Sequence, residues 1–474
     1  MGSSFAQERS GGSQKKSLTW AKRWLVSQRS ATANYNQPMR LSPFIFTAML
    51  AAGLPAQAQT TASQSSSERP AAVPAVSLAQ VLEAAGSNLD VWLARRALAA
   101  AQGDVDAADH APTPVLTAKT ASIDLQNGIG GGNLLSQKRI DKAIGLDWTW
   151  ERGNKRALRT ASAQSTASAA QSDINDMRMQ QQLAAAGAYF DLLAAQERIE
   201  QVSALARSAD QLASTAARRV SAGDLAAQDA ARTDIEAQRA QADLLSAQLD
   251  RQRARLTLGL LIGNTSAQTL TAFSDWPALE PERTPGDTEN LPPVDARADV
   301  KAAALRLEAA RSAVDLAASQ KKPDVTLGTS FDHYPGTSTR LVELRLQIPL
   351  YGVLGGYNFQ GEIARAQALQ NQAEDTLDKV RRAALADLQR LQQEKQGFAA
   401  RAQRYQEVIV PRAHQVADMA ELAYRKGAMS LTDLIDARRT LRTTLLEAIA
   451  ARTDYAKAAA AWQLRNLPLY ATGN

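Results

Sequence analysis

The sequence predicts a mainly α-helical protein with a small β part, built from two tandem repeats of helix–strand–strand–long helix–helix. Three observations lead to this fold class. Two uninterrupted helical patterns, near residues 154–220 and 358–425, would each extend roughly 100 Å at 1.5 Å per residue. Four short segments alternate between apolar and polar residues with period two, which is typical of strands. The whole order of elements then recurs about 205 residues later, which is the signature of an internal repeat.

The first repeat is assigned to residues 77–263. A helical pattern begins at Ser77 and runs to about Asp109, where Pro112 and Pro114 stop it. Two alternating segments follow and are predicted to be strands joined by a Gly-rich loop, at 115–125 and 140–150. The long helix comes next, breaks at Gly223, and gives way to a helix that ends near Leu261.

The second repeat is assigned to residues 294–467, after a Pro-rich connector at 264–293. Its predicted strands are 325–331 and 341–350, and its long helix breaks at Gly427. The two halves match at nearly constant spacing, since Pro114 corresponds to Pro323 and Gly223 to Gly427. This agreement supports a duplication rather than a chance resemblance of helices.

The N-terminal residues 1–58 are interpreted as an upstream extension followed by a secretory signal. Met39 is the expected start, and a short basic and apolar run ends in an A-x-A site, with cleavage after Ala58. A membrane anchor is the alternative, but the apolar run is short and contains prolines. Residues 59–76 are a polar lead-in and residues 468–474 a C-terminal tail.

Composition excludes several classes of function. The chain has no Cys and three His, which leaves little for a metal site, a thiolate nucleophile or a His-based triad. The formal net charge of +6 arises entirely from residues 1–58, so the remaining chain is neutral and has no electrostatic footprint for nucleic acid. We find no phosphate loop and no nucleophile motif. We therefore expect neither an enzyme nor a cofactor.

The four strands have one apolar face for which the chain supplies no second sheet. In 140–150, for example, Ile144, Leu146, Trp148 and Trp150 share a face. Lipid would satisfy such a face, but four strands cannot close a barrel and open edges do not occur in lipid. Three copies would supply a twelve-stranded barrel, continued by a tunnel of helices. The two tryptophans are read either as lipid-interface aromatics or as hairpin packing.

The segment Tyr424–Ala437 carries the most specific pattern. Gly427 breaks the helix, Ser430 or Thr432 can cap the next one, and Asp433 and Asp436 then share a helix face. The first repeat has the same signature in Gly223 and Asp229. Acids at a helix start are also favoured by the helix dipole alone, so a solvated turn is the alternative to a functional acidic site.

With this turn and the duplicated layout, residues 77–467 resemble the TolC-type outer-membrane efflux channels. The resemblance implies a homotrimer, with a twelve-stranded barrel in outer-membrane lipid of a Gram-negative bacterium and a periplasmic helical tunnel. It also implies two protein partners, a periplasmic membrane-fusion adaptor and an inner-membrane RND-type transporter. The chain would be a passive exit duct, and a duct for type I secretion or drug export, or a periplasmic adaptor, remain the alternatives.

The resemblance also assigns roles at the turns. It implies that Asp433 and Asp436 form rings that constrict the tunnel, and that Tyr424 and Asp229 take part in bonds that hold this end shut. One position departs from the family, because Met429 stands where a basic residue is expected. The segment Gly356–Ala366 is similar to the cobalt–zinc–cadmium branch of the family, which implies heavy-metal cations as cargo.

Overall fold

The computed structural model describes residues 75–466 apart from 122, 124, 129, 132–139, 265–266, 280–292, 335–337 and 352–355. Contacts within the chain separate residues 1–68 from residues 69–474, and every described residue belongs to the second unit. The expected leader, most of the lead-in and the tail therefore lie outside the described residues.

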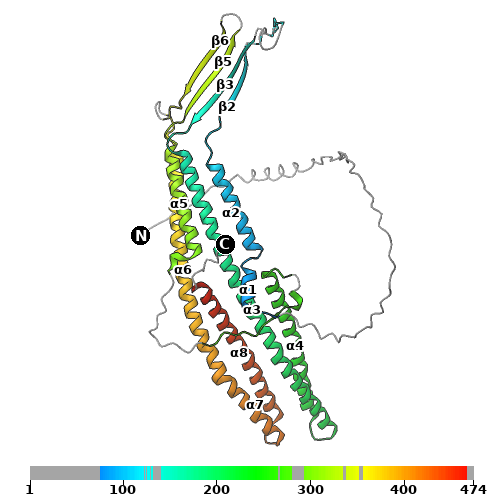
Figure 1. Ribbon diagram of the computed structural model, residues 1–474. Coiled ribbons are helices and arrows are strands. Elements are labelled where there is room, and N and C mark those ends of the chain that lie inside the picture. Colours follow the sequence, from blue (N-terminus) through cyan, green and yellow to red (C-terminus); the bar gives the residue numbers. More distant parts are fainter. Residues whose placement is uncertain are drawn as a thin grey trace, which may run out of the picture. The chain divides into compact units, whose positions relative to one another are not determined.

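Helices dominate this unit, and their order follows the chain. The elements are β1 (Ala75–Val76), α1 (Leu78–Ala85), α2 (Leu89–Ala108), β2 (Val115–Ala121), β3 (Asp141–Trp150), α3 (Lys155–Ser221), α4 (Ala227–Leu261), β4 (Thr271–Ala272), α5 (Ala298–Ser319), β5 (Val325–Tyr334), β6 (Ser338–Gln347), α6 (Gln360–Arg404), α7 (Val410–Arg425) and α8 (Leu431–Asn466). In Figure 1 the large sheet lies at one end of α2, α3, α5 and α6, and the α3–α4 and α7–α8 turns lie at the other.

The large sheet is antiparallel throughout, in the order β2–β3–β5–β6. The central pairing joins the two hairpins, with Trp148 opposite Leu327 and Ile144 opposite Phe331. The side chains on this face are exposed in the single chain, including Trp148, Trp150, Leu344 and Leu346. On the other face, Arg345 donates to Asp147 at 2.5 Å across β5, where Gly328 leaves the necessary space.

Three of the strands end at different residues from those expected. β2 stops at Ala121 rather than 125. β5 continues to Tyr334, because Asp332 and Tyr334, assigned to the loop, pair with Leu341 and Ser338. β6 runs over 338–347 rather than 341–350, since Pro349 cannot donate to a ladder and a strand ends before it.

The helix expected over 77–109 is wrong as a single element. α1 ends at Ala85, with Gly86 as its C-cap, and α2 begins at Leu89 after Asn88, whose side chain accepts from Val91 N at 3.2 Å. Asn is a strong N-cap residue, so the three residues 86–88 form a break rather than a continuation. The period of the apolar residues continues across the break, which is why the pattern alone did not reveal it.

The second long helical stretch differs from the first. α3 is continuous over 67 residues, whereas α6 passes through a π-helical turn, Tyr405–Ile409, before α7 begins. Pro411, the second residue of α7, lies just beyond this turn and has no N–H to donate back to it. A π-helical turn is one of the known ways in which a helix accommodates such an interruption.

The connector is more ordered than expected. Its residues Thr271 and Ala272 form β4, which pairs in parallel with β1. Gln196 of α3 fixes this strand, because its amide both donates to and accepts from Ala272. Beside it, buried Tyr189 donates to Phe273 O at 2.7 Å, and this burial raises the pKa of Tyr189 to about 12. The largest hydrophobic cluster of the described residues lies here.

Candidate functional site: the two helix turns

The turns at Gly223 and Gly427 have the same backbone geometry. Both glycines have positive φ, 82° and 73°. Asp224 N donates to Arg219 O at 2.8 Å, and Ala428 N donates to Ala423 O at 2.9 Å. These bonds run back to the last helical turn, as in a Schellman motif, where glycine is favoured because other residues strain at this φ. The geometry explains why both glycines occur where the long helices end.

The two restarts differ in their caps. Ser430 Oγ accepts from Asp433 N at 3.2 Å and donates to Asp433 Oδ2 at 2.7 Å, so Ser430, one of the two expected candidates, caps α8. At the matching position α4 has Ala226, which offers no side-chain cap. An N-cap of Ser rather than Ala stabilises a helix by about 1 kcal/mol, so the α8 turn is the better defined of the two.

The predicted acids lie beside these turns. Asp433 and Asp436 are exposed, on the first two turns of α8. Asp436 is 3.5 Å from Arg439 on the same helix. Asp229, in the first turn of α4, is 3.9 Å from Arg232. Within one chain these acids have the exposure and the placement of a solvated helix start.

Tyr424 and Asp229 do not meet within the chain. The tyrosine hydroxyl instead accepts from Arg219 Nη1 at 3.3 Å, and the guanidinium lies 6.0 Å from the ring centre. Thus α3 supplies the basic group that contacts Tyr424. Met429 is half-buried against the apolar cluster of Leu431, Leu434 and Ile435. A basic residue there would lose this packing.

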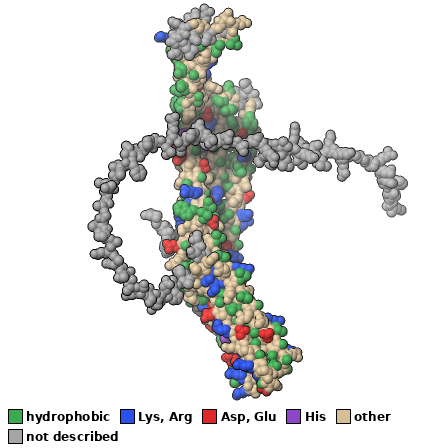
Figure 2. Space-filling model, turned by 90° about the vertical axis from the view of Figure 1, so that its right-hand side faces the viewer, with side chains coloured by type: hydrophobic (Ala, Val, Ile, Leu, Met, Phe, Trp, Pro, Cys, Tyr) green, Lys and Arg blue, Asp and Glu red, His purple; other side chains and the backbone are tan. Residues whose placement is uncertain are grey.

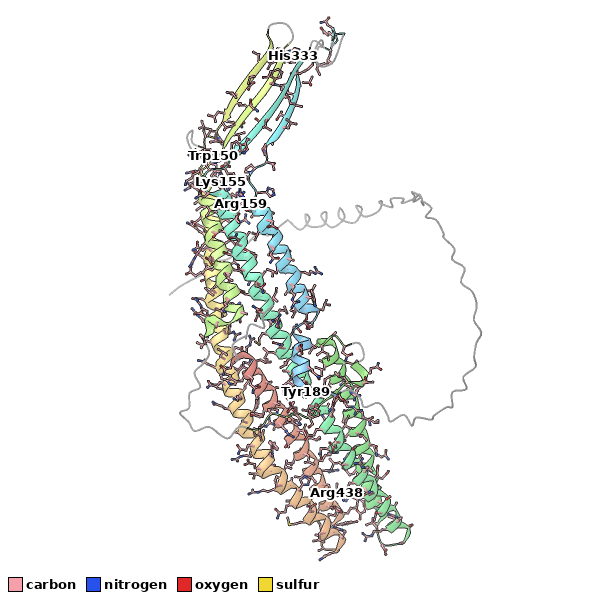
Figure 3. All side chains as sticks on the ribbon, viewed as in Figure 1. Trp150, Lys155, Arg159, Tyr189, His333 and Arg438 are labelled. Atoms are coloured by element: carbon pink, nitrogen blue, oxygen red, sulfur yellow. The ribbon has the colours of Figure 1, made fainter. Side chains whose placement is uncertain are left out.

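Sequence reasoning missed a set of bonds that join the α7–α8 pair to the α3–α4 pair. Arg232 of α4 donates to Thr432 Oγ1 at 3.1 Å. From α8, Arg439 is bonded to Glu236, Arg442 is 2.8 Å from Asp243, and Arg438 Nη1 lies 3.4 Å from Ser208 O. Figure 3 labels Arg438 at the end of the molecule where these helices turn. The hydrogen bond from Arg439 lowers the pKa of Glu236.

Arg438, Arg439 and Arg442 line a cavity of about 160 Å³ between α3, α4, α7 and α8. Its wall also includes apolar side chains such as Leu212 and Ile435. Polar bonds beside this cavity and an apolar cluster, in which Leu212 of α3 packs against Leu434 and Ile435 of α8, together join these helices.

The described part of the chain contains no group of three or more His, Asp or Glu arranged to hold a metal ion. Among the same residues, no helix is long and apolar enough to cross a membrane. The charged side chains that Figure 2 shows over the helices are of both signs and interspersed, so this face has no single-sign patch.

Comparison with known proteins gives consistent relatives. Residues 295–466 match the family model described as outer membrane efflux protein. The cobalt-zinc-cadmium resistance protein CzcC of Cupriavidus metallidurans is 27% identical over 379 residues, which cover 79% of this chain and 85% of CzcC. The pyoverdine export outer membrane protein OpmQ of Pseudomonas putida is 28% identical over 267 residues, 54% of this chain and 55% of OpmQ. The CmeC outer membrane channel of Campylobacter jejuni has the same fold, with a TM-score of 0.69 at 14% identity, covering 82% of this chain and 85% of CmeC.

Proposed function

We propose, from the match of residues 295–466 to the model described as outer membrane efflux protein, that three copies of this chain form the passive exit duct of a tripartite efflux system. In this proposal the two repeats of each copy supply four strands to a twelve-stranded outer-membrane barrel. The helices continue the barrel as a periplasmic tunnel. An adaptor and an inner-membrane RND-type transporter complete the system and provide the energy.

The observation that carries the proposal is the pair of unpaired sheet edges. β2 and β6 each have one neighbour in the described sheet, and both lie at its edges. The four strands alternate in direction, so β6 of one copy can pair with β2 of the next in the same antiparallel pattern. A sheet whose outward face carries Leu344 at 83% exposure and Trp150 at 59% exposure suits lipid once its edges are closed.

The helices show the same incompleteness. α3 packs against α4 and α8, and α8 packs against α7, which leaves α4 and α7 at the two edges of this layer. Both edge helices expose apolar side chains at helical spacing, Leu245, Leu249 and Leu256 on α4 and Val416, Met419 and Leu422 on α7. In a ring of copies, α4 of one copy would pack against α7 of the next and cover both apolar stripes, just as β6 of one copy would pair with β2 of the next.

The acidic turns give the tunnel its constriction in this proposal. Three copies of Asp433 and Asp436 would place six carboxylates around one axis. Their mutual repulsion and their attraction for cations would restrict passage until the α7–α8 pair moves. Tyr424 with Arg219, Arg232 with Thr432 and Arg439 with Glu236 oppose that movement, and Asp229 would contact a neighbouring copy.

Heavy-metal cations are the cargo that the name of CzcC favours. The name of OpmQ favours a second candidate, an organic siderophore. Deletion of the gene should distinguish these, through loss of tolerance to cobalt, zinc and cadmium or through loss of siderophore in the medium.

The duct itself is tested by location and conductance. We expect the chain in the outer-membrane fraction, with the mass of a trimer and a conductance in planar bilayers. Leu344→Arg should abolish membrane residence, since arginine on the lipid face costs about 2–4 kcal/mol at mid-membrane. Glu343→Arg, on the other face of β6, is the matched control and should retain it. A soluble or monomeric protein would refute the proposal.

A further inference from the structure

Two loops meet where the sheet joins the helices. Arg152, between β3 and α3, donates its backbone N–H to Asp324 Oδ1 at 3.0 Å, and Lys155 Nζ donates to the same oxygen at 2.7 Å. Gly153 has φ 82°, and a Cβ there would lie 2.9 Å from Lys322 Cδ. The stem of Lys322 therefore lies over Gly153, directly beside Arg152.

The cations at this junction fall into two groups. Three are paired with acids, Lys155 with Asp324, Arg156 with Asp109 at 2.9 Å and Arg159 with Glu151 at 2.6 Å. The other three are Arg152, Lys321 and Lys322, all exposed. Among the residues that the structure describes, no acid pairs with any of these three side chains. The junction therefore has three positive charges, on Arg152, Lys321 and Lys322, that its acids do not neutralise, because those acids pair with the other three cations.

Exposed aromatic side chains lie at or just beyond the helix-side ends of β3 and β6. Trp148 and Trp150 are 50% and 59% exposed on the outward face of β3. On the chain between β6 and α6, Tyr351 and Tyr357 are 42% and 58% exposed, and both pack on Phe359. Figure 3 shows Trp150 at the base of the sheet, with Lys155 and Arg159 next in line toward the helices. The exposure favours the lipid-interface reading of the tryptophans over hairpin packing.

We propose that Arg152, Lys321 and Lys322 form a binding surface for the phosphate groups of anionic phospholipids, in the leaflet on the helical side. The inference rests on the proposed function, because that function puts the sheet in a bilayer. The order along the surface matches the layers of a leaflet, with aliphatic side chains for acyl chains, indoles for the interface and cations for headgroups. The flexible stems of the two lysines can extend their ammonium groups to phosphates at slightly different depths.

Quenching of tryptophan fluorescence by brominated lipids tests the inference on the full chain. Trp148 and Trp150 report on lipid next to the site. In mixed bilayers we expect brominated phosphatidylglycerol to quench at lower mole fraction than brominated phosphatidylcholine. The triple variant R152Q/K321Q/K322Q should lose at least about tenfold of this preference, since each cation near an anionic surface strengthens binding roughly fivefold. Quenching by phosphatidylcholine should be unchanged.

The matched control removes three exposed cations from the helices, as K301Q/K379Q/R425Q, and should keep the preference. A triple junction variant that retains the preference would overturn the inference, and so would an equal loss in the control, which would indicate a general effect of net charge. If neither lipid quenches, the sheet is not in the bilayer, and the proposed function fails with the inference.

Discussion

Arg439 of α8 and Glu236 of α4 are joined although 203 positions separate them in the chain. Arg439 Nε donates to Glu236 Oε2 at 3.2 Å, and a second bond links the same two groups. The pair connects α4, an edge helix of the first half, to α8 of the second half. Because charge-assisted, two-point contacts are among the stronger hydrogen bonds, we expect this pair to be stronger than the single bonds of Arg232 and Arg438 across the helix pairs.

Breaking the Arg439–Glu236 pair should make the proposed tunnel easier to open at the helix turns. We expect Arg439→Gln to raise single-channel conductance at neutral pH, while Arg239→Gln, which removes a contact to Glu236 within α4, should not. Glu236 has a pKa below its ordinary 4.5, so the pair contributes stability above that value and loses it as pH falls through the lowered pKa. Wild-type conductance should therefore rise in acid, and Glu236→Gln should abolish the rise. Equal conductance of the two arginine variants would contradict this role.

The carboxylates at the start of α8 should control cation passage. Asp433→Asn with Asp436→Asn removes six charges from a trimer, so we expect higher conductance and weaker block by multivalent cations. Bilayer recordings with and without a trivalent cation measure both effects. Asp418→Asn, an exposed acid on α7, serves as the control. An unchanged block would favour the solvated-turn reading.

Alanine substitutions at Gly427 and Gly397 should change the heat-dissociation temperature in opposite directions. Gly427 has φ 73°, where a Cβ is strained by about 1–2 kcal/mol, so Gly427→Ala should lower the heat-dissociation temperature. Gly397 lies inside α6, where a Cβ meets nothing within 4 Å. There alanine should stabilise by about 0.5–1 kcal/mol. A drop for both variants would show that Gly397 is covered in the assembly.

Gly328 should be required for the bond across β5. A Cβ at this position would lie 2.5 Å from Asp147 Oδ1 and 3.2 Å from Arg345 Nε. Gly328→Ala should therefore break the pair and reduce the heat resistance of the proposed trimer on gels. Gly103→Ala, in a helix with open space around the Cα, should not. Retention of full heat resistance would mean that the pair adds nothing.

The partly buried carboxylate of Asp176 should lower the stability of the folded chain at neutral pH, where it is charged. Burial first, and then Asp299, raise its pKa above 3.8, so its charged form costs stability as pH rises through that range. Asp176→Asn keeps an acceptor for Gln180 and should raise the melting temperature at pH 7 but not below pH 3.8. Asp173→Asn, which loses the pair with Arg306, should not stabilise.

Much of the fold could be predicted because its signals are local and periodic. The period-two segments and the two glycines were visible in the sequence, and the structure has strands and left-handed turns there. Strand ends were less predictable, since the pairing of Tyr334 with Ser338 depends on the partner strand. The break at 86–88 depends on the capping side chain of Asn88. Because Asn also occurs within helices, the residue type alone does not predict a break there.

The contacts of the candidate site were beyond the sequence for a different reason. Asp433 could be found because it follows a glycine signal, whereas Tyr424 was assigned a role only by the resemblance to the efflux channels. Arg219 and Arg232 lie on helices with many charged residues, and no spacing rule links them to Tyr424 and Thr432 on helices some 200 positions away. Only the packing of the two helix pairs selects them.

Pro411 and the π-helical turn before it have a mechanical consequence. The interruption lies in the long stretch leading to Gly427, and the stretch leading to Gly223 has no counterpart. A helix is more compliant where its ladder of backbone bonds is interrupted. In the proposed ring of three subunits, the more compliant α6–α7 stretch would alternate with the stiffer α3 helix. The end of the tunnel at the helix turns would then deform with threefold rather than sixfold symmetry, because each α6–α7 stretch would bend against a neighbouring α3 that stays straight.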